Sequence, residues 1–427
     1  MAVDTHKVEV VPVVLEKHPD ADSLSIVRVY NFTVVVRTED WQGIDKAAYV
    51  QPDSVLPDKP EYRFLKESAS LRKERDEIIA AEKQVGFCNA EMSNELIAHR
   101  AAVEAKIDAN TKYLRITVKK LRGVMSMGVL LPIPKCQLCI DDIWSAGLSS
   151  RPTLWGKYHE LGTQGKVLCL DRVVIGDDVA EVLGIGHYEP PSMDEIEGSR
   201  KHAGNDVAPA PEMIYAPKYD VESGYKYANC FESGEPVYVT EKLDGQNARF
   251  VATDGEPYKE TTPAGFVKTC SDVIIHAGSR TEWKKEEGGS NWWRVMEQNP
   301  WIKQWVVDNP GRVLYGETFG WVQLLKYGAK QGQLFFRAFD IIDGMEYLDA
   351  EAFMAAIPED RRVPCLGIMP FDFEKLQKLA DGPSLIPGAS NMREGIVIKP
   401  LKERKHWKLG RVMIKLVSNA YLEKSSR

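Results

Sequence analysis

Hydrophobic and polar residues alternate along the first part of the chain in the manner of β-strands. Segments 7–18, 24–38 and 47–52 are rich in valine and other strand-forming residues, with turn residues between them. Segment 112–134, KYLRITVKKLRGVMSMGVLLPIP, returns to the same pattern. This spacing predicts a small all-β unit in the N-terminal part of the chain.

A charged, alanine-rich stretch interrupts these strands from about residue 66 to residue 110. It contains no proline and one glycine, which favours helix. We therefore predict a helical insertion into the β unit. A solvated helical hairpin is the simpler interpretation of this insertion, and a partner-binding arm is the alternative.

The composition changes near residues 188–212, where proline, glycine, serine and acidic residues replace the regular patterns. We predict an N-terminal domain over 1–188, a linker over 189–211 and a C-terminal domain over 212–427. In the C-terminal domain we predict strands over 312–320, 333–343 and 394–400. We predict helices over 290–309 and 349–357. The predicted fold class is α+β, with antiparallel sheets and flanking helices in the C-terminal domain.

The composition is that of a globular protein. Of the 427 residues, 44% are hydrophobic and 27% are charged, and the net charge is -7. No stretch offers 18 uninterrupted apolar residues, and the N-terminus does not resemble a secretory leader. The seven cysteines are scattered, so we expect a reduced, cytoplasmic protein without a membrane span. The net charge does not indicate a nucleic-acid partner. Any indication of such a partner must therefore come from local patches of basic residues.

One strand ends in an unusual way. The segment EPVYVTEKL, residues 235–243, runs into Lys242-Leu243-Asp244-Gly245, although strands disfavour Asp and Gly. A pattern with three fixed positions occurs by chance about 0.1 times in a chain of this length. A solvated lysine at a strand end is therefore the ordinary interpretation of this motif alone. No P-loop or dinucleotide fingerprint is present, so any nucleotide must bind by another route.

Further motifs follow this lysine in a fixed order. They are Ser279-Arg280, Tyr315-Gly316-Glu317, Phe335–Ile341, Glu394–Pro400 and Met413–Leu416. In this order and at these separations, the motifs resemble those of the covalent nucleotidyltransferase superfamily of polynucleotide ligases and RNA-capping enzymes. The resemblance covers roughly residues 211–427, and several motifs in register carry far more weight than one.

The resemblance implies a catalytic role for Lys242, which would attack the α-phosphate of ATP and hold AMP as a phosphoramidate. The backbone at Glu241 would meet the adenine edge, and Phe339 would stack on the base. Arg280 and Glu317 would contact the ribose.

The same resemblance implies the rest of the cofactor site. Glu394 would bind a divalent metal, Mg²⁺ or Mn²⁺, and Lys399 and Lys415 would contact the phosphates. The last motif has only one lysine, because Met413 and Val417 occupy the alternate positions beside Lys415. Three residues close to the nucleophile are also assigned to cofactor binding: Asp244, Gly245 and Asn247, the last matching an asparagine of one RNA ligase branch.

A lysine nucleophile must lose its proton. At an ordinary pKa near 10.4, about one lysine in a thousand is neutral at physiological pH, which costs about 4 kcal/mol. We expect the cations Lys399, Lys415 and Arg280, with a metal ion, to lower the pKa of Lys242. The same charges would stabilise the phosphates in the transition state.

Two N-terminal segments resemble the tRNA-binding type of OB fold, a small β-barrel that binds oligonucleotides. They are HPDADSLSIVRV (18–29) and LRGVMSMGVLLP (121–132). Lys119, Lys120 and Arg122 give the second segment a basic edge suited to phosphates. A packing module without RNA binding is the alternative, since fold does not determine function.

DNA ligases and capping enzymes carry a further OB domain after the last motif, whereas the sequence runs only from residue 415 to residue 427 beyond it. An N-terminal OB domain, a linker and a ligase domain together resemble the Deinococcus-type RNA ligases. This resemblance implies an ATP-dependent RNA ligase that repairs RNA through a lysyl-AMP intermediate. Its substrate would be a 3′-OH/5′-phosphate nick in duplex nucleic acid with an RNA 3′-OH end, and a monomer is expected.

Three other functions remain open at this point. They are an ATP-dependent DNA ligase of minimal type, a guanylyltransferase that uses GTP, and a non-catalytic OB-fold RNA-binding protein. The first would differ in its sugar preference and the second in its nucleotide. The third is opposed by the presence of Lys242, Glu317, Glu394 and Lys415 together.

The C-terminal tail is basic. Residues 399–427 include nine basic and two acidic residues, together with His406 and Trp407. A charge run is usually a solvated surface, but a basic run with an aromatic residue beside a phosphoryl-transfer site indicates a polyanionic partner.

Overall fold

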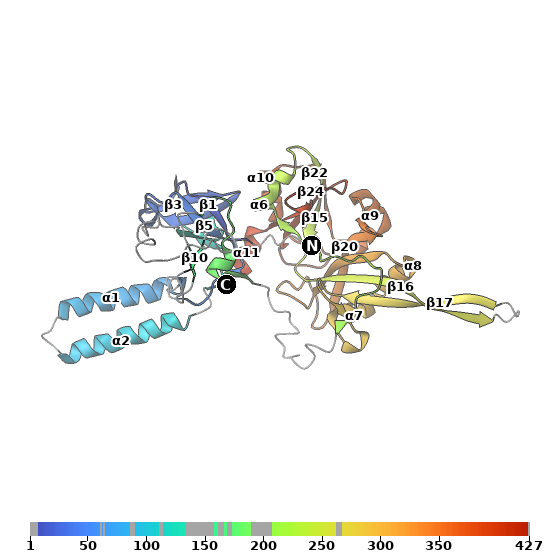
Figure 1. Cartoon of the computed structure of the whole chain (residues 1–427), viewed down its shortest axis with the longest axis horizontal. Coiled ribbons are helices and arrows are strands. Elements are labelled where there is room, and N and C mark those ends of the chain that lie inside the picture. Colours follow the sequence, from blue (N-terminus) through green and yellow to red (C-terminus); the bar gives the residue numbers. More distant parts are fainter. Residues whose placement is uncertain are drawn as a thin grey trace. The chain divides into compact units, whose positions relative to one another are not determined.

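The computed structural model describes residues 7–59, 62, 65–85, 90–110, 114–132, 158–160, 166–168, 173–188, 207–261 and 267–425. Contacts divide the chain into two compact units, one of residues 6–189 and one that includes residues 190–427 (Figure 1). The predicted boundaries at 188 and 212 stay a prediction, because residues 189–206 of the linker lie outside the described residues.

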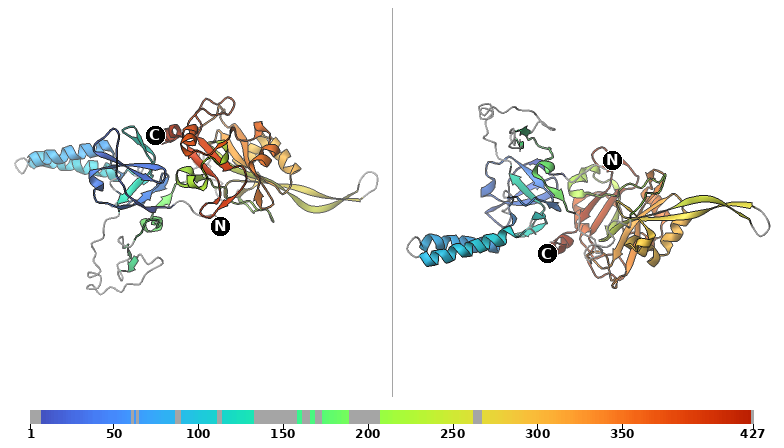
Figure 2. Two further views of the ribbon diagram at one scale, coloured as in Figure 1. Left: turned by 90° about the horizontal axis from the view of Figure 1, so that it is seen from above. Right: turned by 60° about the horizontal axis from the view of Figure 1, so that its bottom comes forward.

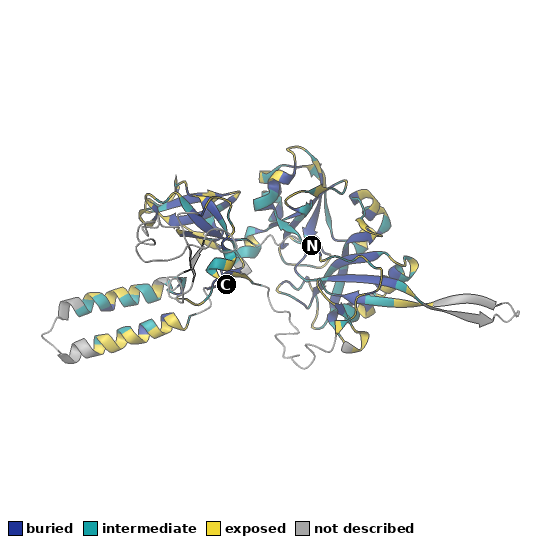
Figure 3. Cartoon of the chain, viewed as in Figure 1, coloured by how far each residue is buried: buried dark blue, intermediate teal, exposed yellow. Residues whose placement is uncertain are grey.

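The N-terminal unit is built from short antiparallel strands, as its alternating pattern predicts. Strands β1 (Glu9–Pro12), β5 (Lys46–Val50) and β9 (Val129–Pro132) form one sheet, and β2 (Glu16–Lys17), β3 (Leu24–Val29) and β4 (Phe32–Arg37) form another. Two pairs complete the set: β7 (Lys119–Leu121) with β8 (Val124–Ser126), and β6 (Ser54–Val55) with β12 (Gly186–His187). Val10, Val50 and Leu131 of the first sheet, together with Tyr62 and residues of the connecting segments, belong to a buried core (Figure 3).

Three shorter elements also belong to this unit. They are the hairpin of β10 (Tyr158–Glu160) and β11 (Lys166–Leu168), the 3-10 turn η1 (Glu39–Trp41) and helix α4 (Ala180–Leu183). A left-handed glycine, Gly184 with φ 68°, ends α4.

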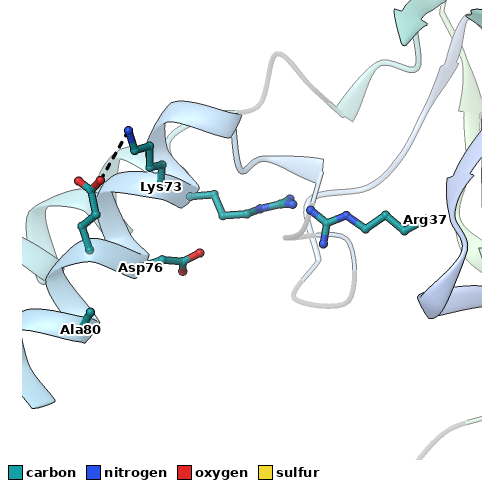
Figure 4. Close-up of a pocket in the computed structure, with 6 residues that line it drawn as sticks. Arg37, Lys73, Asp76 and Ala80 are labelled. Carbon is teal, nitrogen blue, oxygen red and sulfur yellow. Dashed lines mark ion pairs between the residues drawn. The ribbon is translucent and has the colours of Figure 1, made fainter. Parts of the chain in front are cut away.

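The predicted helical insertion is confirmed as two helices, α1 (Ala69–Val85) and α2 (Ala90–Asp108), between β6 and β7. They run side by side and project from the strands (Figures 1 and 2). A small core of their own holds them together, made by Ile78, Val103 and Ile107. A pocket at the base of α1 is lined by Arg37 of β4 and by Arg72, Lys73 and nearby residues of the helix (Figure 4).

The C-terminal unit contains two sheets that pack face to face. The larger has seven strands in the order β13 (Val207–Ala208), β18 (Trp283–Lys284), β17 (Val267–Gly278), β16 (Gln246–Thr261), β19 (Val313–Gly320), β20 (Leu334–Asp343) and β21 (Glu346–Tyr347). The smaller has five, in the order β14 (Glu222–Ser223), β26 (Ile414–Val417), β23 (Gly395–Pro400), β15 (Pro236–Lys242) and β22 (Cys365–Pro370). Apart from the parallel pair β14 and β26, the strands pair antiparallel.

Helices α7 (Asn291–Gln298) and α8 (Trp301–Asp308) cover the outer face of the seven-stranded sheet, where Val295 and Ile302 pack on Phe250 and Phe336. The prediction of one continuous helix over 290–309 was wrong, because the structure has two helices there. Pro300 separates the two helices because proline has no backbone N–H and does not fit inside a helix.

The remaining helices are short and lie around the two sheets. Their bounds are α6 (Gly224–Tyr227), η7 (Ala228–Cys230), η8 (Glu286–Gly288), α9 (Ala350–Ala356), η9 (Glu359–Arg361), α10 (Phe373–Ala380) and α11 (Asn419–Ser425). The predicted helix over 349–357 corresponds to α9. In the part of the chain that the structure describes, no helix is both long and apolar enough to cross a bilayer.

The inner faces of the two sheets meet in a second core. Tyr315 of the larger sheet and Met413 and Val397 of the smaller sheet belong to it. Antiparallel partners point to the same side of a sheet. Lys242 lies opposite Gly395, and Val397 lies opposite Lys415, so both lysines face the seven-stranded sheet.

Candidate active site

Lys242 is the last residue of β15, and its ammonium group lies at the edge of the space between the two sheets. The Nζ atom lies 2.5 Å from Oε1 of Glu394, the residue just before β23. The antiparallel register, which sets Lys242 opposite Gly395, brings the two together across 152 residues of sequence. The side chain of Lys242 keeps 24% of its surface exposed, so a substrate can reach the nucleophile.

Gly245 makes the turn after Lys242 possible. A Cβ atom at this position would overlap the carbonyl oxygen of Thr318 and lie 3.0 Å from Cγ of Glu317. Only glycine permits this close approach between the turn and β19. The chain then enters β16, where Asn247 lies opposite Glu317. The turn therefore brings Lys242, Asn247 and Glu317 into one site.

The electrostatic surroundings of Lys242 differ from the prediction. Burial lowers the pKa of Lys242, but the negative charges of Glu394 and Glu317 outweigh burial and raise it overall. The expectation that neighbouring cations lower this pKa is wrong for the protein by itself. The nearest charged groups are carboxylates, and they hold the proton on the lysine.

Three carboxyl groups share this site with the lysine. Burial raises the pKa of Glu317 to about 8, and it also raises the pKa values of Glu394 and Asp244. The charge of Lys242 lowers each of them but does not cancel the effect of burial. A site with three carboxyls around one ammonium group favours a further cation.

The donor atoms present fit a divalent metal that is also bound by a phosphate-bearing substrate. Oε2 of Glu394 and Oδ1 of Asn247 are buried without a hydrogen-bond partner. Within the described residues, no three His, Cys, Asp or Glu side chains are grouped as a metal site of their own. Mg²⁺ is often held by one or two carboxylates together with substrate phosphates, and Glu394 is suited to that arrangement.

Asp244 has a supporting position in the structure, and its predicted contact with the cofactor stays a prediction. Its Oδ2 accepts a hydrogen bond from the amide of Leu325 at 2.8 Å, and its Oδ1 accepts one from the Tyr421 hydroxyl at 3.2 Å. Its amide donates to the hydroxyl of Tyr327 at 2.7 Å. Both carboxylate oxygens are therefore engaged, and Asp244 joins a loop and helix α11 to the end of β15.

Glu241 is buried on the opposite side of β15 from Lys242. Its carboxylate accepts hydrogen bonds from Oγ of Ser384 at 2.6 Å and from the amide of Leu385 at 2.7 Å. The side chain thus fixes the loop that leads to Glu394. The predicted role of its backbone at the adenine edge stays a prediction.

The predicted nucleoside contacts of Phe339 and Arg280 stay predictions, and the structure shows only their protein neighbours. Phe339 is half-buried on β20, with its ring centroid 4.6 Å from that of Tyr219. Arg280 is near enough to Glu317 to lower the pKa of that carboxyl, and its Nη1 lies 3.3 Å from Oδ1 of Asp220. Asp220 was not predicted as part of the site.

Lys399 forms a buried ion pair. Its Nζ lies 2.7 Å from Oδ2 of Asp340 and donates to the carbonyl oxygen of Phe339 at 3.0 Å, and the side chain is fully enclosed. Lys399 lies opposite Tyr238, four positions before Lys242 on β15, or about 13 Å along the strand. In this structure the ammonium group of Lys399 is engaged in its buried ion pair and supports the backbone of Phe339. The predicted contact of Lys399 with a phosphate stays a prediction.

Asp340 is the centre of a buried network that the sequence analysis did not identify. Besides Lys399, its Oδ2 lies 2.7 Å from Nη2 of Arg411 and accepts a hydrogen bond of 2.6 Å from the Tyr219 hydroxyl. The charges of Arg411 and Lys399 overcome burial and hold the pKa of Asp340 below its usual value. An acidic residue inside the hydrophobic strand FFRAFDII was the available signal, because a buried carboxylate needs cationic partners.

Lys415 remains the better candidate for a phosphate contact. It lies on β26 opposite Val397, and its charge lowers the pKa of Glu394, which places it beside the site. The structure therefore brings together Lys242, Asn247, Glu317, Glu394 and Lys415, and it assigns Asp244 and Lys399 to supporting positions.

Comparison with known families agrees with this architecture. Residues 235–417 match the RNA ligase family, and residues 6–82 match an OB-fold domain family. These matches confirm the predicted combination of an N-terminal OB-fold domain with an RNA ligase domain. The Deinococcus-type branch within the RNA ligases stays a prediction.

Solved structures of one RNA ligase, from Naegleria gruberi, have the same fold. A lysine-to-alanine variant with ATP and manganese is 21% identical, has a TM-score of 0.61, and the match covers 98% of this chain and 99% of that chain. The enzyme with pyrophosphate is 22% identical with a TM-score of 0.60, covering 98% of each chain. A glutamate-to-alanine variant with AMP and manganese is 21% identical with a TM-score of 0.59, covering 98% of this chain and 99% of that chain.

None of the curated proteins compared with the chain gives a significant match. The family matches and the solved structures together confirm the predicted fold class, and residues 235–417 are similar to the RNA ligase family.

Proposed function

We propose, from the RNA ligase match over residues 235–417, that the chain joins RNA ends with ATP through a lysyl-AMP intermediate on Lys242. One observation carries the proposal. The Nζ atom of Lys242 lies 2.5 Å from Glu394, in a site that also holds Glu317 and Lys415. A half-buried lysine with this set of charged neighbours at a strand end is suited to nucleophilic attack on a phosphate.

The first step forms a bond between the lysine and AMP. Lys242 loses its ammonium proton, and the neutral Nζ attacks the α-phosphorus of ATP. The N–P bond forms while the bond from that phosphorus to the pyrophosphate oxygen breaks, and the second Nζ proton leaves. Lys415 would offset the negative charge of the phosphates, and Phe339 would hold the base.

The second and third steps return Lys242 to its starting state. A 5′-phosphate oxygen of the RNA attacks the same phosphorus, the N–P bond breaks, and Lys242 regains its protons. The 3′-OH then attacks the 5′-phosphate of the adenylated RNA end, loses its proton and releases AMP. Glu317 and Arg280 would keep the ribose of AMP in place throughout.

ATP and a divalent metal are the proposed cofactors. The solved Naegleria gruberi structures were obtained with ATP, AMP, pyrophosphate and manganese, which supports this choice. A metal ion bound at Glu394 supplies positive charge to the phosphates. The raised pKa values of Glu317 and Glu394 support the same conclusion, since an added cation would favour their charged forms.

The proposed substrate is a 3′-OH/5′-phosphate nick in duplex nucleic acid with an RNA 3′-OH end, and the proposed process is RNA repair by a cytoplasmic monomer. The exposed hairpin of β7 and β8 supports an RNA partner, because Lys119, Lys120 and Arg122 lie on it in the OB-fold unit. Comparing nicks that carry one 3′ ribonucleotide with all-DNA nicks would separate this substrate from that of a DNA ligase.

Covalent adenylation tests the proposal directly. The protein is first treated with pyrophosphate to remove any AMP, then incubated with α-³²P-ATP and Mg²⁺ or Mn²⁺ and run on a denaturing gel. We expect label on the wild type and no label on Lys242→Ala. Lys330→Ala, which removes an exposed lysine of the same unit, should label normally.

Two results would contradict the proposal. Label with GTP and not ATP would assign the protein to guanylyl transfer. No label with either nucleotide, on folded protein, would leave a non-catalytic RNA-binding protein as the function.

A further inference from the structure

The tail of the C-terminal unit carries an exposed aromatic side chain on a small hairpin. Strands β24 (Lys405–His406) and β25 (Gly410–Arg411) pair antiparallel, and residues 407–409 connect them. Trp407 in this connection is 83% exposed. Among the described residues, it is the one tryptophan whose side chain is largely exposed. A tryptophan is costly to leave in water, which makes this position a candidate contact surface.

The base of the hairpin is firmly attached to the unit. Arg404 donates to both carboxylate oxygens of Glu235, at 2.8 and 2.9 Å, and to the carbonyl oxygen of Cys230. Arg411 donates to Glu403 at 2.8 Å and pairs with the buried Asp340.

The connection itself is also held in place. Leu409 is buried, and His406 accepts a hydrogen bond from the amide of Lys408. Trp407 is therefore presented from a fixed support, which reduces the entropy lost when it binds a partner.

The charges around Trp407 are positive. Lys405 and Lys408 flank it, both exposed, and neither forms an ion pair in the described part of the chain. The Nζ atom of Lys408 lies 4.8 Å from the centre of the Trp407 ring. The two glutamates closest to the hairpin base, Glu235 and Glu403, are already paired with arginines. The tip thus combines an aromatic face with two uncompensated cations.

We propose that the β24–β25 tip, defined as Lys405, Trp407 and Lys408, binds a single-stranded stretch of RNA that flanks the nicked duplex of the proposed substrate. Trp407 stacks on an unpaired base, and the two lysines contact the adjoining phosphates. This inference rests on the proposed function. Nucleic acid fits better than a protein partner, because protein interfaces are depleted in lysine, whereas single-stranded RNA is bound by aromatic platforms set in positive charge.

The tip lies away from the reacting atoms. The hairpin base contacts Cys230 and Glu235 just before β15 begins, and Lys242 lies at the other end of that strand. The six steps of β15 span about 20 Å, which corresponds to about six nucleotides at 3.4 Å each. The tip therefore contributes to holding the RNA and takes no part in adenylation.

The test compares binding of two polyanions by the full-length protein. The probes are a 5′-phosphorylated 12-nucleotide single-stranded RNA and inorganic polyphosphate of similar length, which has charge but no bases. Trp407→Ala should weaken RNA binding at least about fivefold and leave polyphosphate binding unchanged. Trp407→Phe should restore most of the RNA affinity.

A second variant tests the lysines. The double substitution Lys405→Ala with Lys408→Ala should weaken binding of both probes and reduce the slope of log Kd against log salt by about 1 to 2. Lys330→Ala serves as the control for loss of one exposed charge. With a nicked RNA that also carries a single-stranded flank, the KM of Trp407→Ala should rise while kcat stays near that of the wild type.

The failure of this inference can be distinguished from the failure of the proposed function. Self-adenylation with ATP is measured on every variant and should stay at the wild-type level. If the wild type adenylates and Trp407→Ala binds RNA as tightly as the wild type, the tip is not an RNA contact, and a protein partner becomes its better explanation. If the wild type itself does not adenylate, the proposed function is wrong and the inference is lost with it.

Discussion

Lys242 differs from a surface lysine in its neighbours. Its ammonium group lies against Glu394 and close to Glu317, and these carboxylates raise its pKa. Without a nucleotide or metal, these carboxylates therefore favour the protonated form of Lys242. Binding of a nucleotide with its metal would change this balance, because a cation at Glu394 competes with Lys242 for the same carboxylate. The resting ion pair keeps the lysine in position until the substrate arrives.

The raised pKa of Glu317 predicts a dependence of stability on pH. The folded carboxyl keeps its proton up to about pH 8, whereas the unfolded one releases it near 4.5. Between these values the folded state binds more protons, so the contribution of Glu317 to stability falls as pH rises. The melting temperature of the wild type, relative to that of Glu317→Gln, should therefore decrease from pH 5 to pH 8. Parallel melting curves across this range would show that Glu317 does not titrate there.

Lys399 and Lys415 show why residues of one motif series can have different tasks. Both face the seven-stranded sheet, but Lys399 meets Asp340 and the carbonyl oxygen of Phe339. Lys415 lies near Glu394 instead. A buried lysine without a partner is strongly destabilising, so its ion pair with Asp340 restricts Lys399 to a structural position.

At the scale of elements, the turn from β15 to β16 is the part of the fold on which the site depends most directly. Gly245 lets the turn pack against the backbone of Thr318 and the side chain of Glu317. The turn thus sets the spacing between the nucleophile on the smaller sheet and the carboxylate on the larger sheet.

Gly245→Ala should separate these two elements. The added methyl group overlaps the carbonyl oxygen of Thr318, and we expect a loss of about 1–3 kcal/mol in the free energy of unfolding. A displacement of about 1 Å would slow adenylation by about 100-fold. Both are measured by thermal unfolding and by the rate of label transfer. Gly186→Ala, whose Cβ would meet nothing within 4 Å, is the control, and equal adenylation rates for the two variants would contradict the assignment.

The helical hairpin of α1 and α2 and the long hairpin of β16 and β17 are the two projecting elements (Figure 2). The first has a small core of its own around Val103 and Ile107, and it belongs to the N-terminal unit. The second extends a sheet that carries Asn247 at its base. Of these two hairpins, only the base of the second contributes a residue, Asn247, to the cluster around Lys242 among the described residues.

At the scale of the whole molecule, the division into two units predicts that adenylation and substrate binding depend on different units. All residues proposed for adenylation lie in the unit that includes residues 190–427, which has its own hydrophobic core. A fragment of residues 207–427 should therefore label itself with α-³²P-ATP at a rate similar to that of the full chain. Its sealing of nicked RNA should fall at least about tenfold, because the OB-fold unit supplies nucleic-acid contacts. Full sealing activity by the fragment would show that this unit is not needed for the substrate.

The sequence by itself predicted the class of several elements and a set of residues that the fold places near Lys242. Alternation of hydrophobic residues predicted the strands, because side chains point to alternate faces of a sheet. The ordered motifs, from Lys242 to Lys415, identified the residues that the fold brings together. Pro300 was also a sequence signal for the break between α7 and α8.

Only the tertiary structure decided how the residues of the site affect one another. The pKa of Lys242, the buried pair of Lys399 with Asp340 and the attachment of Asp244 to Tyr421 all join residues more than 50 positions apart. A charge acts on its neighbours through distance and burial, and neither is recorded in the order of residues along the chain. For this reason the sequence predicted which lysine is the nucleophile, while the direction of its pKa shift depended on the carboxylates that the two sheets place around it.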